Sequence, residues 1–228
     1  MSSATQLENR NAARLLPTSR RLRIGGVLWI LAAVQFVVAM VVVQLAWTHP
    51  YDLLQNAISD LGAVTCHENP MGTSYVCSPL HEVFNASIII FGVLVASGAL
   101  VTQPAFPPRR TASAAGATLM IAGLGATLVG VFPEDVYGTG HGIGALLAFV
   151  GASIALILFG VAMTHERKWA PYRILSFGCG AISGGTVILS IISENWGPIG
   201  FGGLERIILA PALVWLVVMG LVLVRAPV

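Results

Sequence analysis

Six long apolar runs constrain this chain more than any other feature of its sequence. A helix needs about 20 apolar residues to cross the roughly 30 Å hydrocarbon core of a bilayer. The runs are long enough for that, and they cover about residues 24–47, 83–102, 112–132, 140–163, 173–193 and 205–225. We therefore predict an all-α fold, a polytopic bundle of six transmembrane helices.

The composition agrees with a chain that lies almost entirely in lipid. Of the 228 residues, 56% are hydrophobic and only 10% are charged, whereas soluble domains average about 25% charged residues. We expect a single membrane domain over residues 24–225. Residues 1–23 are polar, carry five arginines and lack the short apolar core of a secretory signal. They predict a mobile basic tail in the cytoplasm.

Basic and acidic residues fall on opposite sides of the predicted bundle. Eleven of the twelve basic residues lie in the tail, at 103–111, at 164–173 or at the C-terminus, and eight of the ten acidic residues lie on the other side. Basic connections face the cytoplasm in most membrane proteins. The pattern predicts a multi-pass protein of the plasma membrane with both termini in the cytoplasm. We expect no nucleic-acid partner.

Two cysteines lie in the long first outer loop. Cys66 and Cys77 are predicted to face an oxidising compartment, where a disulfide persists. A bridge there would stabilise the loop by about 3 kcal/mol in the chain-entropy model. Cys179 lies within a span and is expected to be a small packing residue.

Polar residues gather at the predicted outer ends of the spans. Arg206 is the only basic residue at that level, so we expect it to pair with a carboxylate of another segment, Glu194, Asp135 or Asp60, or with a lipid phosphate. Glu134 and Asp135 share a proline-containing turn, where acids are common for turn chemistry. The residues predicted to bind a ligand are Asn56, Ser59, Asp60, His81, Asn85, Asp135, His141, Glu194, Glu205 and Arg206.

The segment YDLLQNAISDLGA, residues 51–63, follows the first span and has a helical periodicity. Its polar and apolar residues fall on opposite arcs of a helical wheel, with Asn56, Ser59 and Asp60 against Leu54, Ile58 and Leu61. The preceding Pro50 suits the first turn of a helix. We expect an amphipathic helix that lies in the membrane interface and caps the bundle with its polar side.

Three motifs in this order, NAISDLGA, FPED and HGIGALLAF, resemble the prokaryotic membrane family catalogued as domain of unknown function 998. The resemblance covers about residues 24–225 and implies a prokaryotic polytopic membrane protein with no assigned reaction. A fainter similarity is to the eukaryotic DRAM-like membrane proteins, which implies lipid-linked regulation. It is carried by Ile58, Ser59, Asp60 and Gly62 and by His141, Gly144 and Ala145.

Three classes of function compete for the predicted outer pocket. We favour a non-enzymatic protein without a cofactor that binds the head group of a membrane lipid, or a membrane-protein partner. The alternative is a metal-dependent lipid hydrolase that holds Zn²⁺ and leaves one position open for water. Its metal ligands would be Asp60, His81, Asp135 and His141. A transporter is less favoured, because the spans lack charged residues at mid-depth.

Overall fold

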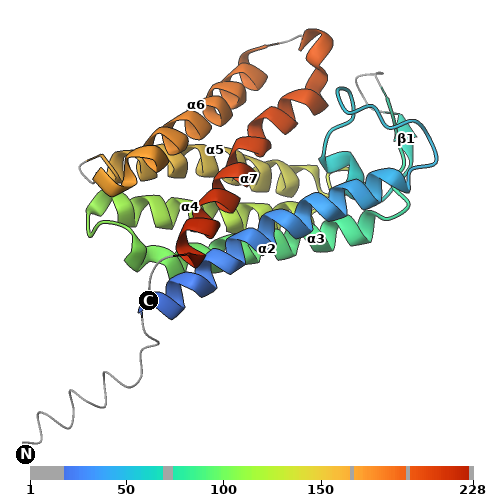
Figure 1. Ribbon diagram of the computed structural model, residues 1–228. Helices are drawn as coiled ribbons and strands as arrows, with labels where there is room; N and C mark the ends of the chain where they lie inside the picture. Colours follow the sequence, from blue (N-terminus) through green and yellow to red (C-terminus); the bar gives the residue numbers. More distant parts are fainter. Residues whose placement is uncertain (1–17, 69–73, 165–166, 194–195, 226–228) are drawn as a thin grey trace, which may run out of the picture.

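The computed structural model describes residues 18–68, 74–164, 167–193 and 196–225. Its long helices are α2 (Thr18–Leu45), α3 (His81–Thr102), α4 (Arg110–Val131), α5 (Gly138–Ala162), α6 (Ala170–Ile192) and α7 (Gly200–Val224) (Figure 1). All six are long and apolar enough to cross a membrane. The predicted all-α architecture is therefore confirmed for the described part of the chain. Helix α2 begins before residue 24, so residues 18–23 of the predicted tail are helical.

The short elements lie in the connections between the long helices. The 3₁₀ helices are η1 (Ser59–Gly62), η2 (Gln103–Ala105), η3 (Arg167–Trp169) and η4 (Gly197–Ile199). Strands β1 (His67–Glu68) and β2 (Tyr75–Val76) pair antiparallel between α2 and α3. An isolated hairpin of this size is marginally stable. The predicted disulfide between Cys66 and Cys77 is present and closes it, with the two Cα atoms 4.3 Å apart.

The six helices form a ring in chain order. Each helix packs against the helices before and after it in the sequence, and α7 packs against α2 to close the ring. Short connections favour this antiparallel arrangement from α3 to α7, whereas α2 and α3 are joined by the long loop of residues 46–80. Outward-facing apolar side chains remain exposed, as a lipid-facing surface requires: Leu100 is 65%, Ile174 69% and Ile191 70% exposed.

Small residues bring the backbones of neighbouring helices together. A Cβ atom at Gly123 of α4 would press against the Gly92 carbonyl of α3, and one at Gly144 of α5 would press against the Gly125 carbonyl of α4. Lipid supplies no hydrophobic force between helices, so their association depends on such close packing. Helix α4 is thus fixed against both of its neighbours.

Residues 51–64, here called the cap, cover the end of the ring that carries the disulfide. The expectation of an amphipathic helix at this place is wrong, because only Ser59–Gly62 is helical, and as a 3₁₀ turn. The Asp52 side chain accepts hydrogen bonds from the backbone N–H groups of Leu54 and Gln55 and so replaces helical bonds. The cap turns inward, and the side chains predicted to lie on opposite faces, such as Asn56 and Leu61, are both fully buried.

Candidate functional site

The cap rests on the N-terminal turn of α7. The Gly203 N–H donates a hydrogen bond of 3.0 Å to the Leu54 carbonyl. Gly200 has a φ of +63°, which favours glycine, and a Cβ atom there would overlap the same carbonyl. A Cβ atom at Gly202 would overlap the Asn56 carbonyl. The glycines at the start of α7 therefore allow the backbone of the cap to approach the helix closely.

Arg206 fastens the cap to α7 through neutral acceptors. Its Nη1 donates hydrogen bonds of 2.8 and 2.9 Å to the carbonyls of Asn56 and Gly202, and its Nη2 donates one of 2.7 Å to the Tyr51 hydroxyl. The guanidinium also lies over the Tyr51 ring, with Cζ 5.6 Å from the ring centroid. That hydroxyl donates in turn to the Ala57 carbonyl at 2.8 Å. Arg206 thus holds the first half of the cap.

Asp60 is 3% exposed and lies at the centre of the cap. Its Oδ2 accepts hydrogen bonds from Asn56 Nδ2 at 2.9 Å and from the Ala57 N–H at 3.1 Å. Its carboxyl is also hydrogen-bonded to the carboxyl of Glu134, in the connection between α4 and α5. Burial, and after it the neighbouring Glu134, raises the pKa of Asp60 to about 7. Two carboxyls in contact therefore share a proton near neutral pH.

Glu134 belongs to this cluster, although the sequence predicted only that it lies in a turn where acidic residues are common. Its carboxyl is hydrogen-bonded to the side chains of Ser59 and Asp60, and burial raises its pKa. Turn acids are usually solvated, and nothing local to Glu134 shows that the cap covers it. The one sequence signal was its place in the FPED motif. Tyr51 was also missed, because its hydrogen bond with Arg206 joins segments that are 155 positions apart in the chain.

Asp135, the next residue, binds the far end of the cap instead. Its carboxylate accepts hydrogen bonds from the Val64 N–H at 3.1 Å, the Thr65 N–H at 2.6 Å and the Thr65 hydroxyl at 2.7 Å. Burial alone would raise the pKa of Asp135, but these hydrogen bonds outweigh it and lower the pKa. Asp135 is thus a structural acceptor for the segment that leads to the disulfide.

The hydrogen bonds of Asp60, Asp135 and Arg206 bear on the ion pair that was expected of Arg206. Asp60 and Asp135 are both bonded elsewhere, and neither forms an ion pair with Arg206 in the described structure. Backbone carbonyls and a hydroxyl surround the guanidinium in place of these two carboxylates. The third expected partner, Glu194, lies outside the described residues.

His81 and Asn85 connect the cap to α3. Asn85 Nδ2 donates a hydrogen bond of 2.9 Å to the Gly62 carbonyl. His81 Nδ1 lies 3.0 Å from the Ser78 carbonyl, and the Ser78 hydroxyl donates at 2.6 Å to the carbonyl of Leu61. The predicted site residues on α3 therefore hold the second half of the cap in place.

The expected metal ligands do not come together. Among the residues that the structure describes, no three His, Cys, Asp or Glu side chains form a group that could hold a metal ion. His81 and His141 each place Nδ1 near a backbone carbonyl, that of Ser78 and that of Phe132. Asp60 and Asp135 bind the two halves of the cap. This donor set does not fit the proposed Zn²⁺.

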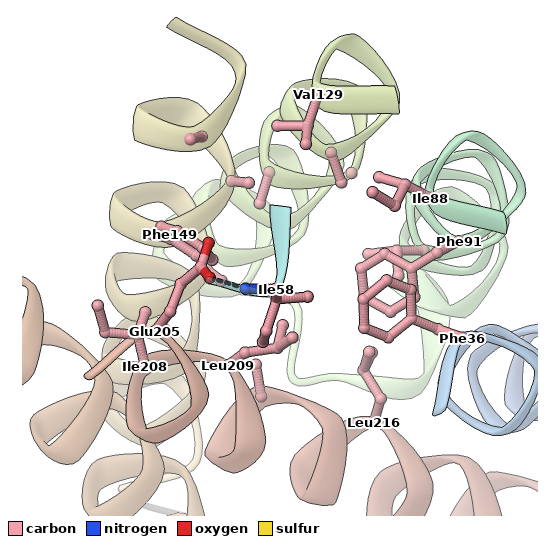
Figure 2. Close-up of a pocket in the computed structure, with 18 of the residues that line it drawn as sticks. Phe36, Ile58, Ile88, Phe91, Val129, Phe149, Glu205, Ile208, Leu209 and Leu216 are labelled. Atoms are coloured by element: carbon pink, nitrogen blue, oxygen red, sulfur yellow. Dashed lines mark hydrogen bonds between the residues drawn. The ribbon is translucent and has the colours of Figure 1, made fainter. Parts of the chain in front are cut away.

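Glu205 connects the cap to the interior of the ring. Its side chain is 7% exposed and accepts hydrogen bonds from the backbone N–H groups of Ile58 and Ser59. Figure 2 shows Ile58 between Glu205 on one side and the rings of Phe36 and Phe91 on the other. The carboxyl of α7 and the backbone of the cap together form the roof of an internal space.

This space is a cavity of about 90 Å³ inside the ring, beneath the cap. Its walls come from α2, α3, α4, α5 and α7, and they consist almost entirely of alanine, leucine, isoleucine, valine and phenylalanine side chains. The polar side chains that face it are those of Ser59, His141 and Glu205. The cavity is thus apolar along its walls and polar where it meets the cap.

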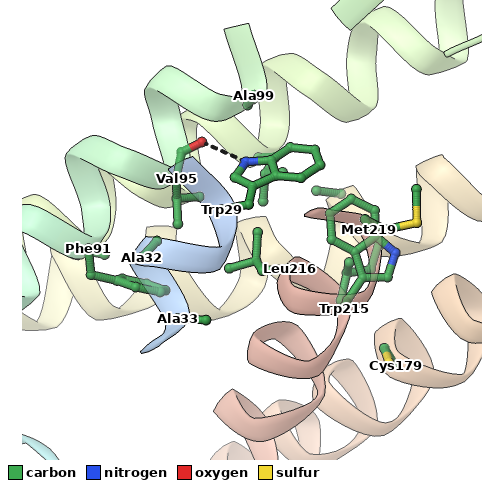
Figure 3. Packing of buried hydrophobic residues seen from close by; sticks show 14 of the residues in the cluster. Trp29, Ala32, Ala33, Phe91, Val95, Ala99, Cys179, Trp215, Leu216 and Met219 are labelled. Atoms are coloured by element: carbon green, nitrogen blue, oxygen red, sulfur yellow. Dashed lines mark hydrogen bonds between the residues drawn. The ribbon is translucent and has the colours of Figure 1, made fainter. Parts of the chain in front are cut away.

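Aromatic rings close the cavity away from the cap. Trp215 lines it ten residues further along α7 than Glu205, which corresponds to about 15 Å of helix. Its ring centroid lies 5.3 Å from that of Trp29 and 4.9 Å from that of Phe159. Its Nε1 donates at 2.8 Å to the Ser176 hydroxyl, and Trp29 Nε1 donates to the Val95 carbonyl (Figure 3). The indole N–H groups of Trp215 and Trp29 therefore both have acceptors, and the aromatic rings at this end of the cavity pack against one another.

Comparison with known proteins identifies a family. No curated protein and no solved structure shows significant similarity to the chain. A family model matches residues 30–222, from the second turn of the apolar part of α2 to the last turn of α7. The matched region contains the cap, its carboxyl partners and the whole cavity. The chain therefore belongs to the family described as protein of unknown function (DUF998).

Proposed function

We propose that this membrane protein binds a lipid, with one apolar chain of the lipid in the cavity and its head group at the cap. The observation that carries the proposal is the polarity of the cavity, which is apolar over most of its length and polar only at Ser59, His141 and Glu205. Ligand sites generally combine apolar walls with a few polar groups that fix orientation. An amphiphile matches this distribution.

The size of the cavity supports a chain rather than a bulky ring system. About 10–15 Å³ of such space is needed for one water-sized group, so a cavity of about 90 Å³ holds roughly six to nine methylene-sized groups in a row. That corresponds to part of one acyl or alkyl chain. The outer surface of the ring is apolar and exposed, so the bilayer that would supply the lipid would lie directly beside the ring.

The charge distribution supports one orientation of the protein in the membrane. The connection between α4 and α5 carries Glu134 and Asp135 at the cap end, whereas Arg109 and Arg110 lie at the opposite end of α4. The positive-inside tendency supports a cap on the outer face and both termini in the cytoplasm of a prokaryote. A lipid of the outer leaflet would then reach the cap with its head group.

Native mass spectrometry of the purified protein tests lipid binding. Ala126 of α4 lines the cavity, so Ala126→Leu should fill it and reduce co-purified lipid severalfold. Ala117→Leu lies on the exposed face of the same helix and is the matched control, with unchanged lipid content. Ala148→Leu on α5 fills the cavity from the other wall. Equal lipid in all four proteins would refute the proposal.

The other candidate functions gain no support from the described residues. A hydrolase with Zn²⁺ would need ligands that converge, whereas Asp60 and Asp135 hold the cap and the two histidines lie against backbone carbonyls. Binding of a membrane-protein partner or transport through the ring has no comparable feature in the described structure. The lipid site is therefore the function that the geometry favours.

A further inference from the structure

Glu205 faces the cavity and is able to accept hydrogen bonds. A carboxylate has about four acceptor positions, and the N–H groups of Ile58 and Ser59 use two of those on Glu205. At His141, Nδ1 lies 2.9 Å from the Phe132 carbonyl, which has no hydrogen to give. The ring is also hydrogen-bonded to the backbone of Val129, whereas Glu205 keeps free acceptor positions.

Arg206 acts electrostatically on Glu205, but it does not line the cavity. Among the described residues that line it there is no lysine and no arginine. The nearest candidate, Arg206, directs its guanidinium to Asn56, Gly202 and Tyr51 in the cap. The carboxyls of Asp60 and Glu134 do not line the cavity, but both act electrostatically on Glu205. An anionic head group beside Glu205 would therefore meet a carboxyl and no basic side chain of the cavity lining.

We propose that the lipid site takes a single-chain amphiphile whose head group donates hydrogen bonds, a hydroxyl or an ammonium, and that it rejects phosphate and carboxylate head groups. This inference rests on the proposed lipid binding and adds its chemical selectivity. Glu205 accepts from the head group directly. Because lipid tails gain little by moving from bilayer to apolar cavity, this polar pairing decides which lipid stays bound.

Bromine quenching of tryptophan fluorescence reads out this selectivity. Trp215 lines the cavity on the side away from the cap, so the end of a bound chain would lie near it. The probes are four chains of equal length, ω-bromo-octanol, ω-bromo-octylamine, ω-bromo-octanoic acid and ω-bromo-octyl phosphate, added to the purified full-length protein in one detergent. Trp215→Phe defines the background from the other four tryptophans.

The alcohol and the amine are expected to quench Trp215 at concentrations at least about tenfold lower than the two anions. Glu205→Gln should weaken the amine about tenfold and leave the alcohol nearly unchanged, because an amide still accepts a hydrogen bond but carries no charge. His141→Phe removes a polar ring from the lining of the cavity and should weaken the alcohol. It also serves as the test if Glu205→Gln does not fold.

The possible results separate the two proposals. Equal quenching by all four probes, or stronger quenching by the anions, would overturn the donor selectivity while leaving lipid binding intact. Quenching by the alcohol alone would assign the site to neutral head groups, and quenching by the amine alone would assign it to cations. If no probe quenches Trp215 above background, and Ala126→Leu changes nothing, both the selectivity and the lipid site are refuted.

Discussion

The backbone N–H of Ile58 donates a hydrogen bond to the carboxyl of Glu205, although 147 positions separate the two residues in the chain. The bond joins the middle of the cap to the second turn of α7, directly above the cavity. Both residues are buried, with 5% and 7% of their surfaces exposed. A cap without regular secondary structure over most of its length is thus fixed by side chains of the helices beneath it.

Removal of the Glu205 carboxyl should therefore destabilise the protein. Glu205→Leu leaves the N–H groups of Ile58 and Ser59 without their acceptor, which costs about 1–3 kcal/mol for a buried group. Glu205→Gln keeps an acceptor oxygen and should lose less. Thermal unfolding in detergent measures both, with the exposed Glu82→Leu as a control that should not change the midpoint. Equal midpoints for the Leu and Gln variants would contradict this role.

A substitution at Gly202 should also destabilise the protein, because the backbones of the cap and α7 are in close contact there. A Cβ atom there would overlap the Asn56 carbonyl and approach the Arg206 guanidinium, so Gly202→Ala must displace the cap. Overpacking of this kind costs about 1–3 kcal/mol. Gly178→Ala on α6 is the matched control, because a Cβ atom at that glycine meets nothing within 4 Å. A similar shift in the unfolding midpoint of the two variants would show that the cap yields easily.

The membrane helices could be predicted from the sequence because their signal is local. Each apolar run is long enough to span a bilayer, and a helix is then the structure that satisfies its backbone. The observed helix α5, Gly138–Ala162, starts two residues before the predicted 140–163. The disulfide between Cys66 and Cys77 could also be predicted, because the predicted topology places both cysteines in one outer loop.

The cap could not be predicted in this way, because its structure depends on contacts between distant segments. The helical periodicity of residues 51–63 was real, but Asp52 and Asn56 use their side chains on nearby backbone groups and compete with the helix. The burial of Glu134 depends on the cap above it. The predicted polar residues that the structure describes did gather at one end, yet most of them hold the cap, and of these described residues only His141, Ser59 and Glu205 reach the cavity.

The proton shared by Asp60 and Glu134 predicts a stability that depends on pH. Burial raises the pKa of Asp60 from 3.8 to about 7 in the folded protein, so protonation favours folding. This contribution is complete below about pH 4 and is lost as the pH rises through about 7. The raised pKa of Glu134 acts in the same direction. The unfolding midpoint in detergent should fall between about pH 5 and pH 8.

Substitution of the aspartate separates this effect from others. Asp60→Asn cannot ionise, so its midpoint should change much less over the same pH interval. Glu82→Gln, at an exposed site, should retain the pH dependence of the wild-type protein. The lowered pKa of Asp135 acts at more acidic pH, where its carboxylate takes up protons, and does not disturb this window. A midpoint that rises towards pH 8 would refute the shared proton.

The disulfide should contribute to stability through the length of the loop that it closes. Cys66 and Cys77 are 11 positions apart, and a loop of this size corresponds to about 3 kcal/mol in the chain-entropy model. The effect should reach the bundle because Asp135 binds Thr65, next to the bridge. The double variant Cys66→Ser/Cys77→Ser should therefore unfold at lower temperature than Cys179→Ser, and identical midpoints would show that the hairpin is uncoupled from the helices.

Labelling of cysteines in intact cells tests the orientation on which the proposed outer-leaflet ligand depends. Tyr137 is 57% exposed at the cap end, and Arg109 is exposed at the opposite end of α4. In a Cys179→Ser background, a membrane-impermeant maleimide should label Tyr137→Cys in intact cells and Arg109→Cys only after the membrane is opened. This result is expected because connections rich in basic residues tend to face the cytoplasm. The reverse pattern would place the cap in the cytoplasm, where its ligand would have to come from the inner leaflet.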